Sequence, residues 1–227
     1  MSPQQKEATA PAPRPVPRTA TREVRRRQLI MAAMDSIAQR GFSDTTLRHV
    51  TENAKLSHGV VNYHFDSKEA LYDAILEYLA KEHYQLWRRN LDAAGDDPAA
   101  KLTAIVKADF DRKICTPKKM AVWFAFWGQA KYRPNYLKIH NIYDEERSRE
   151  ITRICTALAG PGDADGKGAE ATAHAIEAMI DGLWLSMLLY PAGTTAAGCH
   201  RDCMQAISRM FPGRFDDDMD AAPSHGR

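Results

Sequence analysis

Residues 57–68 read SHGVVNYHFDSK. Ser57 is a favourable N-cap, and Asp66-Ser67 followed by Glu69 and an apolar run is typical of a second helix start, so a short helix leads directly into a longer one. The outward side of the short helix would carry only small or hydrogen-bonding groups: Ser57, His58, Gly59, Asn62, Tyr63 and His64. A surface that contacts phosphates and base edges needs such groups and no carboxylate. An ordinary exposed helix is the alternative at this stage.

Two further helices are predicted before this stretch. Apolar residues recur every three to five positions from Thr21 to Arg40, and Gly41 is suited to end that helix. Residues 45–54 predict a second, shorter helix, and Lys55-Leu56 predicts a turn. Helix, short helix, tight turn and short helix is the order of a helix-turn-helix, whose last helix enters the major groove of DNA.

The composition is that of a globular protein. Of the 227 residues, 44% are hydrophobic and 26% are charged. No apolar run reaches the length of about 18 residues that a membrane span needs, and the absence of an apolar signal core makes a cytoplasmic location the expectation. Cys115, Cys155, Cys199 and Cys203 lack the spacing of a disulfide framework or a metal site, so we expect neither a metal nor another cofactor.

Charge is distributed unevenly along the chain. Residues 1–68 contain eleven Lys and Arg against six Asp and Glu, whereas the remainder contains 20 against 23. A basic N-terminal part on an acidic body is typical of a protein that presents one end to nucleic acid, although a solvated charged face would look similar.

The chain is predicted to be all-α, with four segments. Residues 1–20, rich in Pro and Ala, predict a disordered arm, and residues 21–68 a three-helix DNA-binding domain. Residues 69–212 predict a helical ligand-binding and dimerisation domain, which begins within a long helix from Asp66 to about Asn90. Its later helices start at Pro98, Pro117 and Pro134, and the charged middle of the last of these, residues 144–150, is expected to be exposed. Residues 213–227 predict a disordered, acidic tail.

An aromatic segment, residues 120–130, reads MAVWFAFWGQA. Trp123 and Trp127 are four residues apart and share one helix face, and the segment is apolar nearly all round, so it must be buried. Core packing would account for this pattern, and so would the wall of a binding pocket.

A second apolar segment, residues 175–189, contains Asp181 and Trp184 on one helix face. A carboxylate in such a segment needs a partner, because an unpaired buried charge is costly. A hydrogen bond to another helix or an ion pair across a subunit interface would satisfy it. A cationic ligand would also do so, since indole rings and a carboxylate together form a cage for a quaternary ammonium group.

The N-terminal motifs resemble those of the tetracycline-repressor family of bacterial transcription factors. The resemblance rests on Gly41-Phe42, Thr45-Thr46-Leu47 and the run from Gly59 to Leu71, and it covers residues 22–72. It implies an all-helical homodimer whose C-terminal domain binds a small molecule and thereby releases operator DNA. By position it implies DNA contacts from the second helix, the recognition helix and the start of the fourth: Thr46, Arg48, Ser57, His58, Gly59, Asn62, Tyr63, His64 and Lys68.

Arg25, near the start of the first helix, is a further candidate for a phosphate contact, with a solvated helix face as the alternative. Two residues depart from the family pattern. Lys55 replaces the usual glycine of the turn, which is expected to strain the turn, and Asn62 stands where many members carry Tyr, which leaves the base preference open.

The C-terminal segments are similar to those of the choline-responsive repressors of glycine betaine synthesis genes. Phe110-Asp111 and the two apolar segments described above carry this similarity. It implies that choline or a related quaternary ammonium compound is the effector, with Trp123, Trp127 and Trp184 as walls and with Asp111 or Asp181 as the counter-charge.

We therefore expect a homodimeric transcriptional repressor that binds operator DNA and responds to a small molecule. Two C-terminal helices of each subunit would form the dimer interface. A regulator of the same fold that binds a neutral or apolar ligand is the main alternative. An enzyme is a weaker one, since the chain has no Gly-rich phosphate loop, no metal-spaced histidines and no nucleophile elbow, and no catalytic residue is assigned.

Overall fold

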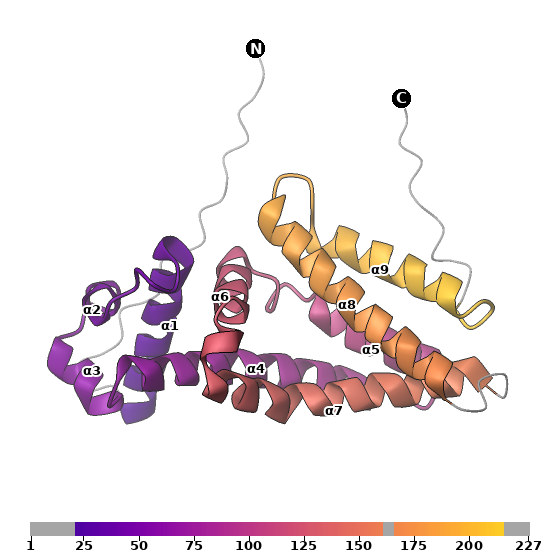
Figure 1. Cartoon of the computed structure of the whole chain (residues 1–227), viewed down its shortest axis with the longest axis horizontal. Helices are drawn as coiled ribbons and strands as arrows, with labels where there is room; N and C mark the ends of the chain where they lie inside the picture. Colours follow the sequence, from indigo (N-terminus) through magenta and orange to yellow (C-terminus); the bar gives the residue numbers. More distant parts are fainter. Residues whose placement is uncertain (1–20, 161–165, 216–227) are drawn as a thin grey trace, which may run out of the picture.

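The computed structural model describes residues 21–160 and 166–215. Within these ranges the chain is helical and contains no strand, which confirms the predicted all-α class (Figure 1). The α-helices are α1 (Arg22–Arg40), α2 (Leu47–Ala54), α3 (His58–His64), α4 (Lys68–Ala93), α5 (Pro98–Asp109), α6 (Pro117–Trp127), α7 (Pro134–Ala159), α8 (Lys167–Leu189) and α9 (Ala196–Met210), with the 3-10 helix η1 (Ala130–Tyr132) before α7. The arm predicted over residues 1–20, and the predicted tail from residue 216 onward, lie outside the described residues.

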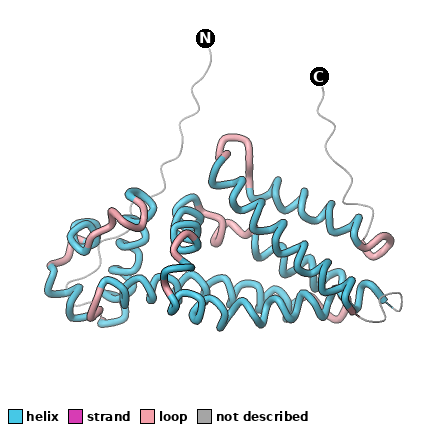
Figure 2. Tube along the Cα trace, viewed as in Figure 1, coloured by secondary structure: helices cyan, strands magenta, loops and turns pink. Residues whose placement is uncertain are grey.

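Local chemistry explains where most of these helices begin. Ser67 accepts a hydrogen bond from the backbone N–H of Ala70, and α4 therefore starts at Lys68, two residues later than the sequence suggests. The predicted helix starts at Pro98, Pro117 and Pro134 are confirmed. Proline suits the first helical position, because the N–H that it lacks would have no partner within the helix there. Short loops join the helices (Figure 2).

The turns of the N-terminal part follow backbone sterics. Gly41 ends α1 with a φ of 82°, which a glycine adopts without penalty. Lys55 ends α2 in the left-handed conformation, with φ 53° and ψ 44°, and is the one non-glycine residue with positive φ among those described. The expected strain is therefore present, at a cost of roughly 1–2 kcal/mol.

Helix α4 connects the small N-terminal bundle to the larger C-terminal body (Figure 1). It packs on α1 and, further along, on α5 and α7, while α8 packs on α7 and α9. Helix α6 lies between the two parts and packs against both α1 and α8. Buried apolar side chains form one continuous cluster from Leu29 of α1 to Ile207 of α9. No helix among the described residues is long and apolar enough to cross a membrane.

The expectation that the charged middle of α7 is exposed holds for only part of it. Within residues 144–150, Asp144, Glu145 and Arg149 are exposed, whereas the others are partly or fully buried. Arg147 is only 6% exposed, and Glu146 accepts hydrogen bonds from the Tyr84 hydroxyl and from Arg88 of α4. Arg147 and Glu146 face the body because each has a partner there, which no local sequence pattern reports.

Candidate functional site

The short helix α3 presents a polar, carboxylate-free surface. Val61 is buried and fixes the inner side of the helix, while the outward side is exposed: Ser57, His58, Gly59, Asn62 and Tyr63. The Tyr63 side chain is 69% exposed, and the guanidinium of Arg22 lies 5.7 Å from the centre of its ring. Such a protruding helix, flanked by a cation, suits contact with a DNA groove.

His64 lies deeper than the other predicted residues of α3. Its Nδ1 is buried and has no hydrogen-bond partner in the part of the chain that the structure describes, and burial, with the nearby Arg22 and Arg26, lowers the pKa of its imidazole. The neutral form is thereby favoured, which leaves it a weaker phosphate contact than a charged histidine would be.

The other predicted DNA-contacting residues lie on α1, before and on α2, and at the start of α4, and each has an interaction partner within the protein. The Thr46 hydroxyl caps α2, and the exposed Arg48 pairs with Glu52 at 2.8 Å. Lys68 occupies the first position of α4, with its ammonium 5.2 Å from the centre of the Tyr72 ring. Arg25 donates a hydrogen bond to Gln28.

Sequence reasoning missed the placement of two arginines of α1. The structure brings Arg22 over Tyr63 and Arg26 over Phe65, at 5.7 and 5.1 Å from the ring centres. The run of arginines at the start of α1 was the signal, but only the fold shows that its members border α3.

A pocket of about 370 Å³ lies in the C-terminal body, between α4, α6, α7 and α8 and the end of α5. It brings together four of the five predicted ligand-binding residues: Trp123, Trp127, Asp181 and Trp184. Trp123 and Trp127 precede Asp181 and Trp184 by more than 50 positions in the sequence. Because both segments line the same cavity, they form its wall as well as part of the core.

The indole rings of this pocket are held in defined orientations. The rings of Trp127 and Trp184 are nearly parallel, with an interplanar angle of 8° and centroids 6.5 Å apart. The Trp184 Nε1–H donates a 3.0 Å hydrogen bond to the backbone carbonyl of Asp109, and His83 meets its ring edge-on at 5.9 Å. A buried indole N–H with a partner fixes the ring before any ligand arrives.

The pocket floor contains a buried ionic network that sequence reasoning missed. Asp109, which is 1% exposed, accepts one hydrogen bond from Arg147 Nη2 at 2.7 Å, and its other carboxylate oxygen lies 2.7 Å from His83 Nε2. Arg147 also pairs with Glu177 at 3.2 Å, and the Ser148 hydroxyl donates to the same carboxylate. The signal for Asp109 was its place in the apolar stripe of α5, after Leu102, Ile105 and Val106.

Burial and pairing compete in this network. Burial alone would raise the pKa of Asp109, but the Arg147 guanidinium and the His83 hydrogen bond outweigh burial and lower it. Burial dominates at Glu177 and raises its pKa, in spite of Arg147 and Ser148. Asp109 is therefore held firmly as a carboxylate.

Asp181 behaves differently from the expected buried carboxylate. It lies on the exposed side of α8 at the pocket, and it makes no hydrogen bond or ion pair with the described residues. Desolvation by its surroundings raises the pKa of Asp181 to about 6, against a lowering effect of Arg147. The pocket lining has four carboxylates, from Asp109, Asp144, Glu177 and Asp181, against one guanidinium and three histidines, so the cavity is net negative when the histidines are neutral.

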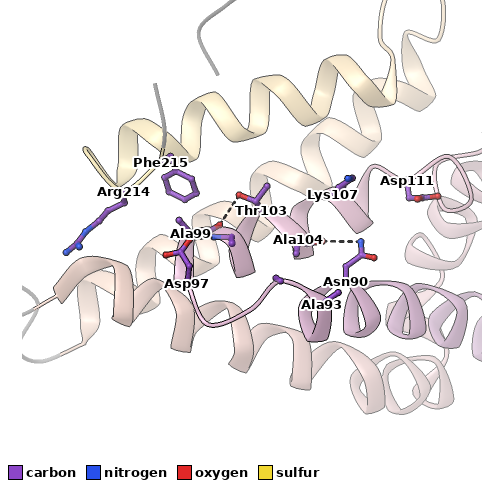
Figure 3. A pocket seen from close by; sticks show the side chains of 12 residues that line it. Asn90, Ala93, Asp97, Ala99, Thr103, Ala104, Lys107, Asp111, Arg214 and Phe215 are labelled. Carbon is purple, nitrogen blue, oxygen red and sulfur yellow. Dashed lines mark hydrogen bonds between the residues drawn. The ribbon is translucent and has the colours of Figure 1, made fainter. Parts of the chain in front are cut away.

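Asp111, the fifth predicted ligand-binding residue, does not line this pocket. Its carboxylate accepts the backbone N–H of Lys113 in the turn after α5, and it borders a larger, open hollow of about 910 Å³ between α4, α5 and Phe215 (Figure 3). That hollow is lined mainly by alanines and polar side chains and has no indole ring. The pocket with the tryptophans is the better candidate, because it combines apolar walls with convergent charged groups.

No group of three or more His, Cys, Asp or Glu side chains in the described ranges is placed to hold a metal ion. The four cysteines are free thiols, and burial raises the pKa of Cys203 to about 12. The Cys203 thiol is therefore protonated near neutral pH.

Helix α6 connects the pocket to the N-terminal bundle. Trp123 and Trp127 line the pocket, whereas Phe126 packs edge-on against Phe42 at 5.4 Å. The Lys118 ammonium of the same helix pairs with Asp35 of α1 at 2.7 Å. A change at the pocket wall can therefore reach α1 through one rigid helix.

Comparison with known families agrees with both parts of this description. A family model described as "Bacterial regulatory proteins, tetR family" matches residues 29–75, and one described as "BetI-type transcriptional repressor, C-terminal" matches residues 98–212. Among curated relatives, the regulator BetI of Burkholderia thailandensis is 33% identical over 170 residues, covering 75% of this chain and 85% of the relative. BetI of Burkholderia mallei is 33% identical over 184 residues, covering 80% and 92%.

Solved structures show the same fold. A transcriptional regulator from Pseudomonas aeruginosa PAO1 superposes with a TM-score of 0.72 at 25% identity, covering 86% of this chain and 94% of that one. A regulator from Saccharomonospora viridis, solved in complex with choline, superposes with a TM-score of 0.67 at 19% identity, covering 82% and 96%.

A helix-turn-helix bundle joined to a helical body with a pocket defines a ligand-responsive transcriptional regulator, a non-enzymatic class. The chain belongs to the tetR family of bacterial regulatory proteins, and its C-terminal part is of the BetI repressor type. Regulators of this family bind operator DNA and small-molecule effectors.

Proposed function

We propose that this regulator represses transcription as a homodimer and is controlled by a quaternary ammonium cation, with choline as the first candidate. The observation that carries the proposal is a net negative pocket with three tryptophan walls. Each indole face attracts a desolvated cation by roughly 0.5–2 kcal/mol, and a trimethylammonium group asks for no hydrogen bond. Choline in the Saccharomonospora viridis regulator, which shares the fold, is consistent with this choice.

The charge of the pocket argues against a neutral or apolar effector. A pocket for such a ligand would also need aromatic walls. An unpaired carboxylate in that pocket, however, would lose its hydration water when the ligand binds and would gain no opposite charge in return. Asp181 has no partner among the described residues, and a cationic ligand would supply one. We therefore assign Asp181, with the tryptophans, to the effector site and leave Asp111 out of it.

We assign operator binding to α3 and its surroundings. Tyr63, Asn62 and the other exposed residues of α3 face the major groove in this proposal, and the phosphate contacts come from α2, the start of α4 and α1: Thr46, Arg48, Lys68, Arg25 and Arg22. A bacterial regulator that binds operator DNA in this way would act in the cytoplasm, where the operator lies.

The homodimer follows from the exposed face of α8. Small and apolar residues recur there at alternating intervals of four and three: Ala171, Ala175, Ala178, Gly182, Leu185 and Leu189. This spacing places them on one side of the helix, and a second copy of α8 and α9 would complete a four-helix interface. Two recognition helices would then span neighbouring major-groove half-sites about 34–36 Å apart.

The proposed switch uses α6. In this proposal a bound cation draws Trp123 and Trp127 toward it and thereby shifts α6. The contacts of Phe126 with Phe42 and of Lys118 with Asp35 then change the angle of the N-terminal bundle. A ligand shifts this balance only by its difference in affinity for the two states, and repression ends when the favoured state no longer fits the half-site spacing.

Isothermal titration of the full-length protein tests the effector class. We expect choline to bind and to quench tryptophan fluorescence, and we expect Trp127→Leu and Trp184→Leu to abolish both effects. Phe211→Leu, a buried aromatic residue that lines neither this pocket nor the small recess next to it, is the control and should retain binding. The uncharged carbon isostere of choline, with tert-butyl in place of trimethylammonium, should not bind. Equal binding of the isostere would support the neutral-ligand alternative, and no binding of choline, betaine aldehyde or glycine betaine would reject the proposal.

A further inference from the structure

Arg147 has an unused hydrogen-bond donor beside the tryptophan pocket. Its Nη2 pairs with Asp109 at 2.7 Å and its Nη1 with Glu177 at 3.2 Å. Its Nε is buried and has no hydrogen-bond partner among the described residues. A buried donor without a partner costs free energy, so it indicates a group that is missing from the isolated chain.

The two ion pairs hold the guanidinium plane in place, which leaves the Nε–H with a set direction. Arg147 lines both the effector pocket and a small recess of about 30 Å³ behind it. The recess shares other wall residues with the pocket, among them His83, Trp123 and His140. Its volume matches one oxygen-sized group, such as a hydroxyl or a single water molecule.

We infer that Arg147 selects the oxygen-bearing end of the effector: its Nε–H donates a hydrogen bond to an uncharged oxygen that enters the recess, while the trimethylammonium group lies among the tryptophans. The inference rests on the proposed function and deepens it. The effector is then a quaternary ammonium compound with a hydroxyl, ether or carbonyl oxygen a few bonds from the nitrogen. A carboxylate at that place would be repelled by Asp109 and Glu177, so glycine betaine binds less tightly than choline.

A ligand series on the unmodified protein tests the inference. Propyltrimethylammonium has the shape of choline with a methyl group in place of the hydroxyl. Since a hydrogen bond to a charged donor is lost, it should bind roughly ten- to a hundredfold more weakly than choline. Choline methyl ether, which can accept but not donate, should stay closer to choline than to the propyl compound. Equal affinity of choline and propyltrimethylammonium would overturn the inference and assign the recess to water, while the proposed function would stand. Failure of every ammonium compound to bind would reject both.

Arg147→Lys separates hydrogen-bond selection from a purely structural role. Lysine keeps a positive charge next to Asp109 and Glu177 but lacks Nε. The variant should still bind propyltrimethylammonium and should lose the preference for choline over it. Arg88→Lys, at an ion pair with Glu146 outside the pocket, is the matched control and should keep the preference. A retained preference in Arg147→Lys would contradict the inference, and if this variant does not fold, the ligand series decides alone.

Discussion

Arg147 of α7 and Asp109 at the end of α5, 38 residues apart in sequence, form a buried ion pair of 2.7 Å directly beneath the candidate effector pocket. Neither side chain is more than 7% exposed. The pair joins the two helices below Trp184, whose indole N–H donates to the backbone carbonyl of the same Asp109. The same few atoms therefore hold these helices together and line the candidate effector pocket.

Removing one partner of this pair should destabilise the protein strongly. In Asp109→Asn, Arg147 keeps only Glu177 as an anionic partner, and we expect a loss of about 3 kcal/mol in the free energy of unfolding at neutral pH. Because pairing lowers the pKa of Asp109, its contribution is present above the ordinary carboxyl range and declines as pH falls through the lowered value. Urea denaturation at several pH values measures this. Glu52→Gln, at the exposed pair with Arg48, is the control and should change little.

Effector affinity should depend on pH through Asp181. Partial desolvation at the pocket, together with the neighbouring carboxylates, raises the pKa of the Asp181 carboxyl to about 6, so it is largely protonated at pH 5 and largely ionised at pH 7. A cation prefers the ionised form, and choline affinity should therefore rise as pH increases through 6. Titrations of wild type and Asp181→Asn across this range separate its effect from that of the pocket histidines. The variant should bind more weakly at pH 7 and show a flatter profile, and identical profiles would remove Asp181 from the site.

Gly59 offers a test that separates folding from DNA contact. A Cβ at this position would meet only the Ser57 hydroxyl, at 3.9 Å, so alanine fits within the protein. Gly59→Ala should stabilise α3 by up to about 0.5–1 kcal/mol, since glycine is the poorer helix former. Operator affinity should nevertheless fall, because the added methyl group would lie on the side of α3 that is proposed to face the DNA. Thermal unfolding and fluorescence anisotropy with operator DNA measure the two effects, and unchanged affinity would exclude Gly59 from the interface.

Breaking the link between α6 and α1 should weaken the response to ligand but not ligand binding. Lys118 pairs with Asp35 at 2.7 Å and is partly exposed, so Lys118→Met should reduce the ligand-induced change in operator affinity by up to about fivefold. Choline affinity of the free protein should stay close to that of wild type. Lys101→Met, which removes a surface pair with Asp96 in the body, should leave the response intact. An undiminished response in Lys118→Met would show that the ion pair does not carry the coupling.

The helices and most of their ends could be predicted from the sequence, because they depend on neighbours along the chain. Ser67, Gly41 and the prolines act within one turn of where they stand, and hydrophobic periodicity identifies the buried side of each helix. The tryptophans of the pocket could be named for the same reason, since Trp123 and Trp127 share a helix face wherever that helix packs.

The ionic part of the pocket was decided only by the tertiary structure. Asp109 and Asp111 are two residues apart, yet α5 ends between them, so Asp109 points inward to Arg147 while Asp111 accepts a backbone N–H in a turn. A buried charge needs a partner, and the partner of Asp109 comes from another helix. Local sequence determined which helices form and which faces are apolar, whereas long-range packing decided which carboxylates meet the tryptophans.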